Sequence, residues 1–170
     1  ACGRQTVQGA PHRDYGACNP QIIVAWMFHV CYDRRNRQTI RKKEYSMKNV
    51  ISTDKAPAAI GPYSQAIEVN GMVYTSGIIP VVPATGEIPE GSVAQAKQAL
   101  TNLSHLLEAA DTSMANVVKT TVFIKEMNDF AAINEVYATF FEGAYPARSC
   151  VEVARLPKDV MLEIEAIATK

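Results

Sequence analysis

The chain has 170 residues, 48% of them hydrophobic, which suits one compact domain with a buried core and excludes global disorder. Its formal net charge is zero, but residues 1–45 carry eight basic and three acidic groups, whereas the rest carries nine basic and 14 acidic groups. A domain with that acidic excess repels phosphate backbones, so the bulk of the chain is not expected to bind nucleic acid.

Residues 1–46 differ in composition from the rest. They contain the only tryptophan and three of the four cysteines. Their apolar run at 22–31 is shorter than the roughly 20 residues that span a bilayer, and no small-residue cleavage site follows it. We therefore expect a poorly ordered, non-domain N-terminal extension, a leader or upstream-derived sequence, followed by a domain at 47–170. The single cysteine of that domain, Cys150, fits a reducing compartment: the cytoplasm, or the mitochondrion if the extension is a genuine leader.

The first half of the domain predicts a β-hairpin and a helix. Asn70-Gly71 separates the strand patterns 64–69 and 72–76, and both turn positions favour this pair because they need φ > 0; 49–52 is a candidate for an additional strand. Ser92-Val93-Ala94-Gln95 predicts a capping-box start of a helix. Apolar residues then recur at helical spacing: Val93, Ala96, Leu100, Leu103, Leu107 and Ala110.

The second half predicts a strand, a helix and two further strands. The strand 117–125 is β-branched, and its alternation places Val118, Thr120, Val122 and Ile124 on one face. Asn128 or Asp129 can cap a helix that stops near Gly143. The buried stripe of that helix is Phe130, Ile133, Tyr137, Phe140 and Phe141. Strands at 148–154 and 160–168 complete the order ββαβαββ, so we expect an α/β (α+β) fold with one mixed sheet and both helices on one face.

Polar side chains alternate with apolar ones in the last two strands. Arg148, Cys150 and Glu152 share one face of the first, and Glu163 and Glu165 share one face of the second. A turn at 155–158 would make the two strands a hairpin, with Cys150 roughly opposite Glu163. We expect this cluster on the sheet face that the helices leave uncovered.

Apolar residues are expected on the same uncovered face. They are Met161, Ile167, and Val117 or Phe123. These are too many for exposure to water, so association through the sheet is the expected outcome.

Three of these side chains could take part in chemistry, and each has a structural alternative. Arg148 is either an ion-pair partner of Glu163 or Glu165, or a clamp for a carboxylate ligand. Cys150 has no nearby histidine, which favours a small buried side chain, or a weak hydrogen-bonding group beside a water, over a nucleophile. Glu163 in partly dry surroundings would have a raised pKa that suits proton transfer, and an interface salt bridge explains it equally well.

The sequence contains no Gly-rich phosphate loop, Ser-His-Asp set, dinucleotide fingerprint or standard metal-ligand spacing. Small residues at Thr75-Ser76-Gly77 would let a ligand approach the backbone closely. The residues therefore predict a cofactor-free site for a small carboxylate on a self-associating domain.

Four segments together resemble the RidA (YjgF-like) reactive intermediate deaminases. They are 56–66 (APAAIGPYSQA), 75–80 (TSGIIP), 147–159 (ARSCVEVARLPKD) and 163–168 (EIEAIA), and the resemblance covers 47–170. It implies a chorismate-mutase-like fold, assembled as a homotrimer with sites between subunits. The implied reaction is hydrolysis of enamine/imine intermediates of the 2-aminoacrylate/2-iminopropanoate type to 2-keto acids and ammonia, without a metal or organic cofactor.

The resemblance also implies roles for individual residues. Arg148 would hold the substrate carboxylate, and Glu163, with Cys150 beside it, would orient and activate the attacking water. Tyr63 would line the pocket from a neighbouring subunit, while the backbone of Ser76-Gly77-Ile78 approaches the substrate. Asn134 would contribute at the rim. The sequence departs from the family pattern at Ile78, where many members carry Gln, and in the short segment 142–144; both bear on substrate range.

Two other functions compete with this reading. The same cleft in a ligand-sensing regulatory module would bind a 2-keto acid or amino acid and signal to a partner. A ribonuclease or translation inhibitor, an activity also attached to the family by name, has only the basic tract 34–43 in its favour. Neither a nucleic-acid nor a membrane partner is expected.

Overall fold

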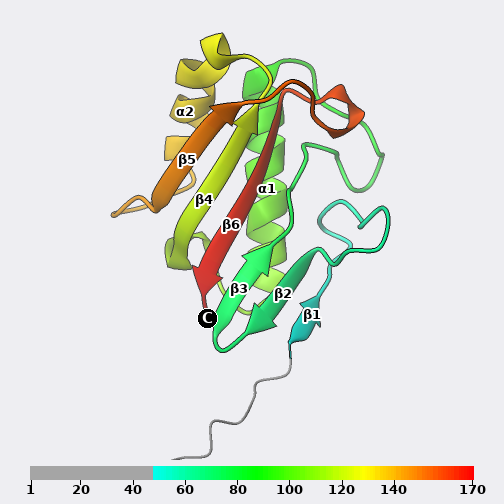
Figure 1. The fold of residues 1–170 in the computed structure, drawn as a ribbon, viewed down its shortest axis with the longest axis vertical. Coiled ribbons are helices and arrows are strands. Elements are labelled where there is room, and N and C mark those ends of the chain that lie inside the picture. Colours follow the sequence, from blue (N-terminus) through cyan, green and yellow to red (C-terminus); the bar gives the residue numbers. More distant parts are fainter. Residues whose placement is uncertain (1–47) are drawn as a thin grey trace, which may run out of the picture. The chain divides into compact units, whose positions relative to one another are not determined.

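The computed structural model describes residues 48–170, which form one six-stranded sheet with two helices (Figure 1). The expectations for residues 1–46, including their separation from a domain that starts at 47, lie outside the described residues and stay predictions. The strands are β1 (Asn49–Ile51), β2 (Ala66–Val69), β3 (Met72–Thr75), β4 (Val117–Ile124), β5 (Ala147–Glu152) and β6 (Leu162–Thr169). The helices are α1 (Ser92–Ala109) and α2 (Phe130–Ala138), with short 3₁₀ turns at Met114–Asn116, Met127–Asp129 and Pro157–Asp159.

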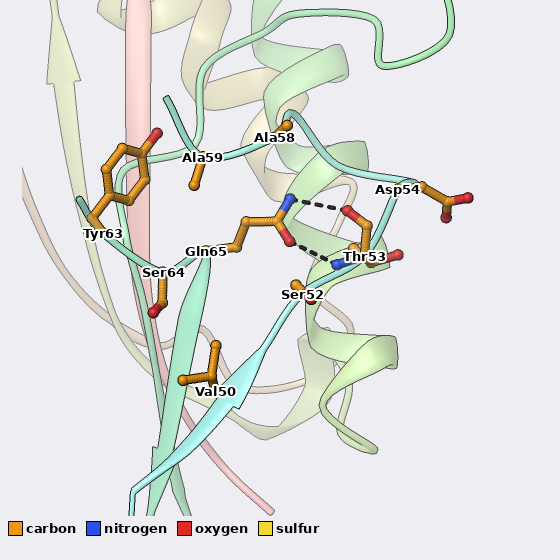
Figure 2. A pocket seen from close by; sticks show the side chains of 9 residues that line it. All are labelled: Val50, Ser52, Thr53, Asp54, Ala58, Ala59, Tyr63, Ser64 and Gln65. Atoms are coloured by element: carbon orange, nitrogen blue, oxygen red, sulfur yellow. Dashed lines mark hydrogen bonds between the residues drawn. The ribbon is translucent and has the colours of Figure 1, made fainter. Parts of the chain in front are cut away.

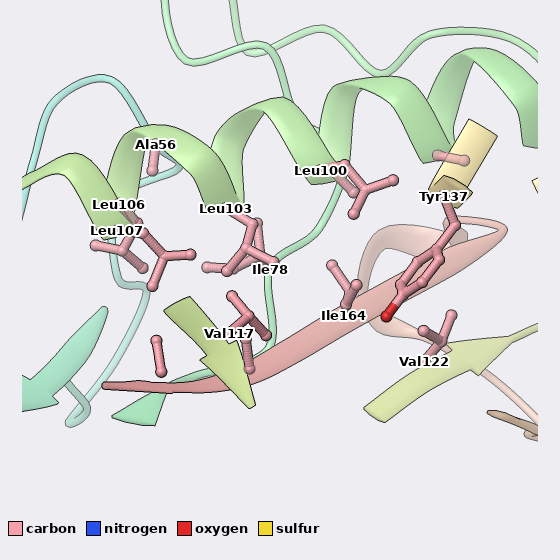
Figure 3. Packing of buried hydrophobic residues seen from close by; sticks show 14 of the residues in the cluster. Ala56, Ile78, Leu100, Leu103, Leu106, Leu107, Val117, Val122, Tyr137 and Ile164 are labelled. Carbon is pink, nitrogen blue, oxygen red and sulfur yellow. The ribbon is translucent and has the colours of Figure 1, made fainter. Parts of the chain in front are cut away.

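The expected mixed sheet with both helices on one face is confirmed (Figure 1). The candidate strand at the start of the domain is present as β1, which pairs with β2. The Asn70-Gly71 turn joins β2 to β3 with φ values of 53° and 73°, as a hairpin of this type requires. The core lies between the sheet and the helices, where leucines of α1 pack on Ile164 and Val117 (Figure 3).

The expected hairpin between the last two strands is wrong. The strand order is β1-β2-β3-β6-β4-β5, so β4 separates β5 from β6. β5 pairs with β4 in parallel, because α2 carries the chain back across the sheet and β4-α2-β5 is a crossover unit. β6 is inserted between β3 and β4 and is antiparallel to both.

This order divides the polar cluster between the two faces of the sheet. Arg148 and Cys150 are in register with Thr120 and Val122 of β4, whose side chains lie in the core under the helices. Glu163 is in register with Phe123, on the opposite face. The expectation that Arg148, Cys150 and Glu152 share the uncovered face with Glu163 and Glu165 is therefore wrong, because alternation within each strand does not fix how two strands are phased.

A register shift between Val117 and Lys119 changes the expected face of β4 at its start. Val117 is buried, with 7% exposure, and Val118 is 44% exposed, whereas the alternation placed Val118 inside. Thr120, Val122 and Ile124 lie in the interior as expected. The extra residue of a bulge reverses the alternation on one side of it, which the sequence pattern does not reveal.

The expected capping box at the start of α1 is also wrong. Gly91 is the N-cap residue, and no side chain caps the helix. The Gln95 side chain instead donates to the carbonyl of Pro89 (2.9 Å) and accepts from the backbone N–H of Met161 (2.7 Å). This buried glutamine therefore ties α1 to the segment that leads into β6.

The second helix is shorter than expected. α2 ends at Ala138, and the Asp129 side chain makes no capping hydrogen bond. Phe140 and Phe141 follow the helix and still pack against the core. Gly143 adopts a positive φ of 80° in the connection to β5, beyond the helix end.

Candidate active site

The first group of candidate residues surrounds Arg148 on the edge strand β5. Its Nη1 donates a 2.7 Å hydrogen bond to the Asn134 side-chain oxygen on α2. The guanidinium carbon lies 4.6 Å from the centre of the Tyr137 ring and 5.4 Å from that of Phe130. Among residues 48–170, Arg148 has no ion pair, so the proposed pairing with Glu163 or Glu165 is not formed. Its positive charge is held by aromatic faces and an amide, and stays available to an anion.

Cys150 lies two residues further along β5, half-buried and packed against the core. Burial raises the pKa of its thiol, and the nearby charge of Arg148 opposes this shift only in part. A thiol with a raised pKa is a poor nucleophile near neutrality. The interpretation of Cys150 as a neutral side chain beside the site, and not as a nucleophile, agrees with this environment.

The second group surrounds Glu163 on β6. A pair of backbone hydrogen bonds holds the segment 76–78 against β6 next to Glu163. Ile78 N–H donates to Ile164 O (2.7 Å), and Ile164 N–H donates to Ile78 O (3.1 Å). This bridge places Gly77 directly against Glu163, and a Cβ on Gly77 would overlap the Glu163 carboxylate. Burial, with a smaller contribution from the charge of Glu165, raises the pKa of Glu163. A glycine at 77 is thus what gives the carboxylate its space.

The three backbone candidates beside Glu163 differ in what they can offer. Ser76 donates its hydroxyl to Ser64 O (2.7 Å) and its N–H to Gln65 O (2.9 Å). The side chain of Ile78 is buried in the core, and both of its backbone polar groups are used in the bridge. Within the described part of the chain, Gly77 alone of the three has neither its N–H nor its C=O in a hydrogen bond. A ligand contact with this segment is therefore best made at Gly77.

Tyr63 lies with this second group. It lines a pocket of about 420 Å³ together with Ser76, Gly77 and Ile78. Tyr63 is 49% exposed, and its hydroxyl accepts a hydrogen bond from the N–H of Ile60 (3.2 Å).

A neighbouring pocket of about 560 Å³ also includes Tyr63 (Figure 2). Gln65 supports the loop around it: it accepts from Thr53 N–H (2.6 Å) and donates to the carbonyls of Thr53 and Pro57 (3.0 and 2.8 Å). Sequence reasoning missed Gln65, although a glutamine beside a strand rich in apolar residues was a usable signal.

The structure thus brings the expected residues together as two groups and not as one. Arg148, Cys150 and Asn134 lie on the helix side of the sheet, at its β5 edge. Glu163 lies on the uncovered face, with Gly77 against it. A single copy of the chain does not place the proposed carboxylate clamp and the proposed proton acceptor on one side of the sheet.

Neither a metal-binding cluster nor a membrane-spanning helix is present in the part of the chain that the structure describes. Residues 48–170 bring no three His, Cys, Asp or Glu side chains together as a metal site. None of the helices in this same range has the length and apolar character needed to cross a membrane.

The comparisons with known proteins identify the family. The model of the family described as Endoribonuclease L-PSP matches residues 53–170, and this chain belongs to that family, which includes the RidA/YjgF-like proteins. A RutC family protein of Pasteurella multocida is 59% identical over 128 residues, which cover 73% of this chain and 99% of that protein. The 2-iminobutanoate/2-iminopropanoate deaminase of Escherichia coli is 54% identical over 127 residues, covering 73% of this chain and 99% of the relative.

Solved structures agree with the fold. The crystal structure of E. coli TdcF with bound serine superposes with a TM-score of 0.70 at 54% identity, covering 72% of this chain and 98% of TdcF. The resemblance noted in the sequence to the RidA family is thereby confirmed, as is the mixed α+β fold.

Proposed function

We propose that this protein is a deaminase that hydrolyses reactive enamine/imine intermediates of the 2-aminoacrylate/2-iminopropanoate type to 2-keto acids and ammonia. The observation that carries the proposal is that the charge of Arg148 is not neutralised. Within residues 48–170 its guanidinium contacts Asn134 and two aromatic rings, and it has no carboxylate partner. The relative named for this activity is 54% identical to the chain. A small 2-imino acid supplies the carboxylate that such an arginine binds.

The reaction needs little from the protein beyond placement. The imine carbon is electrophilic, so water adds to it, a C–O bond forms, and the C=N electron pair moves to nitrogen, which takes up a proton. Glu163, with its raised pKa, accepts the proton that the attacking water loses and delivers it to the nitrogen, so a neutral carbinolamine forms. Glu163 next takes the O–H proton of the carbinolamine as the C=O bond forms and passes it to the nitrogen as the C–N bond breaks, which releases ammonia and the keto acid. In this scheme Arg148 holds the substrate carboxylate, and Cys150 and Asn134 border the site.

We further propose a homotrimer with sites between subunits. The sheet face opposite the helices exposes apolar side chains, among them Tyr74, Val118 and Val151, which a second copy would cover. The separation of Arg148 from Glu163 supports the same arrangement, because a neighbouring copy can supply the missing half of each site. In this arrangement Tyr63, Gly77 and Glu163 of one subunit face Arg148 of the next.

A coupled assay tests the proposed reaction. A serine or threonine dehydratase generates the imine, and release of the keto acid is followed with and without this protein. The wild-type chain should accelerate release, and Arg148→Ala should lose at least about tenfold of that acceleration while keeping its assembly state. Keto acid release at the uncatalysed rate with the wild-type protein would contradict the proposal, and loss of assembly by Arg148→Ala would make Arg148 a structural residue.

The ligand-sensing alternative is favoured by one observation, that the TdcF structure contains serine. A sensor would bind a 2-keto or amino acid without turnover, so ligand binding in the absence of keto acid release would favour it. The ribonuclease alternative follows the family description alone, and the domain from 47 onward has nine basic and 14 acidic residues, which disfavours RNA. RNA cleavage compared with and without residues 1–46 tests it. The expected cytoplasmic location stays a prediction.

A further inference from the structure

The Arg148 side chain packs against one face of α2, and the residues of that face form its binding site, here called the receptacle. Phe130, Asn134 and Tyr137 follow one another at spacings of four and three residues, so their side chains lie on the same side of this helix. All three reach Arg148: the two rings at 5.4 and 4.6 Å from the guanidinium carbon and the Asn134 oxygen at 2.7 Å from Nη1. The guanidinium has five N–H donors, so the bond to Asn134 leaves most of them for a ligand.

Behind this receptacle is a buried pair of hydroxyl groups. The oxygen atoms of Thr120 and Tyr137 are 2.8 Å apart, and the two residues are 0% and 5% exposed. Thr120 is the direct register partner of Arg148 on the neighbouring strand, with its side chain on the same face. Burial raises the pKa of Tyr137, so its phenol stays neutral, and either hydroxyl can be the donor in this hydrogen bond. This hydrogen bond links the Tyr137 ring, which contacts Arg148, to Thr120 on β4.

The contacts of Arg148 with aromatic rings and an amide differ from an ion pair in their effect on its charge. A carboxylate partner would orient Arg148 but would also neutralise it and compete with a substrate carboxylate. Aromatic faces and an amide oxygen orient the guanidinium without cancelling its charge. The orientation then depends on the tilt and height of the Tyr137 ring, which the hydroxyl pair sets.

We propose that Thr120 and Tyr137 are positioning residues for substrate binding: their hydroxyl pair locks the ring that aims the Arg148 guanidinium at the substrate carboxylate. The proposal rests on the proposed function. Neither residue touches the substrate, and both act through Arg148. The ligand class is a small 2-imino or 2-keto carboxylate.

The experiment removes each hydroxyl while keeping the shape of the side chain. Thr120→Val and Tyr137→Phe should each raise KM in the coupled assay by about three- to tenfold with kcat little changed, since Arg148 contacts the carboxylate in the ground state and the transition state alike. Thr120→Ser keeps the hydroxyl and should retain a KM near that of the wild type. The double variant should resemble the worse single variant, because both changes remove one hydrogen bond.

Binding of pyruvate, followed by NMR titration of the full-length protein, gives a readout independent of turnover. Its Kd should rise in Thr120→Val and Tyr137→Phe and not in Thr120→Ser. Thr112→Val is the control: it removes a hydroxyl that donates to Thr169 O (2.6 Å), away from Arg148, and should leave both KM and Kd unchanged. Unfolding midpoints of all variants separate lost positioning from lost stability.

The outcomes separate the inference from the proposed function. Unchanged KM and Kd in Thr120→Val and Tyr137→Phe, or a fall in kcat alone, would overturn the positioning role while leaving the deaminase proposal intact. A Thr120→Ser variant as impaired as Thr120→Val would also overturn it. If the wild-type protein does not accelerate imine hydrolysis, the proposed function fails, and the pyruvate titration still decides the positioning role. A wild-type protein that binds no pyruvate and has no activity would overturn both.

Discussion

Glu163 and Gly77 are in contact, and the Glu163 side chain occupies the space that a side chain at position 77 would need. The carboxylate is half-buried beside a second carboxylate, Glu165, and both conditions disfavour its charged form. A carboxylate held this way costs folding free energy, and the proposed role of Glu163 in proton transfer offers a reason for that cost. Stability and activity should therefore respond in opposite directions when Glu163 loses its charge.

The variant Glu163→Gln tests this opposition. Because the folded state raises the pKa of Glu163 above its usual 4.5, the protonated form favours folding, and this contribution is lost as pH rises through the folded-state pKa. The variant stays neutral, so its unfolding midpoint should match the wild type at about pH 4 and exceed it at about pH 8, while deaminase activity falls. A wild-type protein that becomes the more stable of the two as pH rises would contradict the prediction.

Gly77→Ala tests the contact from the other side. An added methyl group must displace the Glu163 carboxylate, so the variant should lose about 1–3 kcal/mol of stability and most of its activity. Denaturant unfolding measures the first effect and the coupled assay the second. In the Gly77→Ala/Glu163→Ala double variant the overlap is absent, so the double variant should be more stable than Gly77→Ala alone. A double variant whose two losses simply add would show that the contact is not the cause.

Among the elements, the start of α1 shows how a sequence motif can be present and unused. Ser92 and Gln95 have the spacing of a capping box, but Ser92 is already helical and Gln95 turns to Pro89 and Met161. Gln95 can do so because the chain passes its side chain twice, once before α1 and once before β6. Partners that are distant in sequence, and that only the fold places near Gln95, thus replaced the local hydrogen bonds of the capping box.

Paired alanine variants distinguish the two interpretations of this helix start. Gln95→Ala leaves the Pro89 carbonyl and the Met161 N–H without their partner and should cost about 1–3 kcal/mol of unfolding free energy. Ser92→Ala removes no capping bond and should cost less than about 0.5 kcal/mol. Chemical denaturation of both variants provides the comparison. Equal losses, or a larger loss in Ser92→Ala, would restore the capping box.

Sequence reasoning succeeded for elements and failed for their phasing. Alternation placed Thr120, Val122 and Ile124 correctly in the interior. It placed Val118 there wrongly, because a bulge changes which face a residue occupies without changing the residue types. The family motifs singled out Arg148 and its neighbours. The face of the sheet on which they lie depends on β5 pairing in parallel with β4, with Arg148 in register with Thr120, and no local pattern encodes this pairing.

At the scale of the whole molecule, the proposed assembly would bury the uncovered face of the sheet. That face contains Val151, 43% exposed, while Val93 on α1 is 50% exposed away from the sheet. Val151→Asp should reduce the assembly to smaller species and lower activity, because a carboxylate cannot be buried unpaired between subunits. Val93→Asp, at a position of similar exposure, should change neither the assembly nor the activity.

Native mass spectrometry and the coupled assay decide between these outcomes. A trimer that survives Val151→Asp with full activity would place the subunit contact elsewhere. A wild-type protein that is monomeric and active at assay concentrations would contradict the shared site, since one copy divides Arg148 and Glu163 between opposite faces.

The position of β6 also has a consequence for biosynthesis. Of the described strands it is the last to leave the ribosome, yet it lies in the middle of the sheet and joins β3 to β4. Until residues 162–169 emerge, β3 and β4 both lack the strand that pairs with them in the folded domain, so the sheet cannot be completed. Folding of this domain is therefore completed after translation of its last strand, and a truncation ahead of Leu162 should leave two unpaired strand edges that favour aggregation.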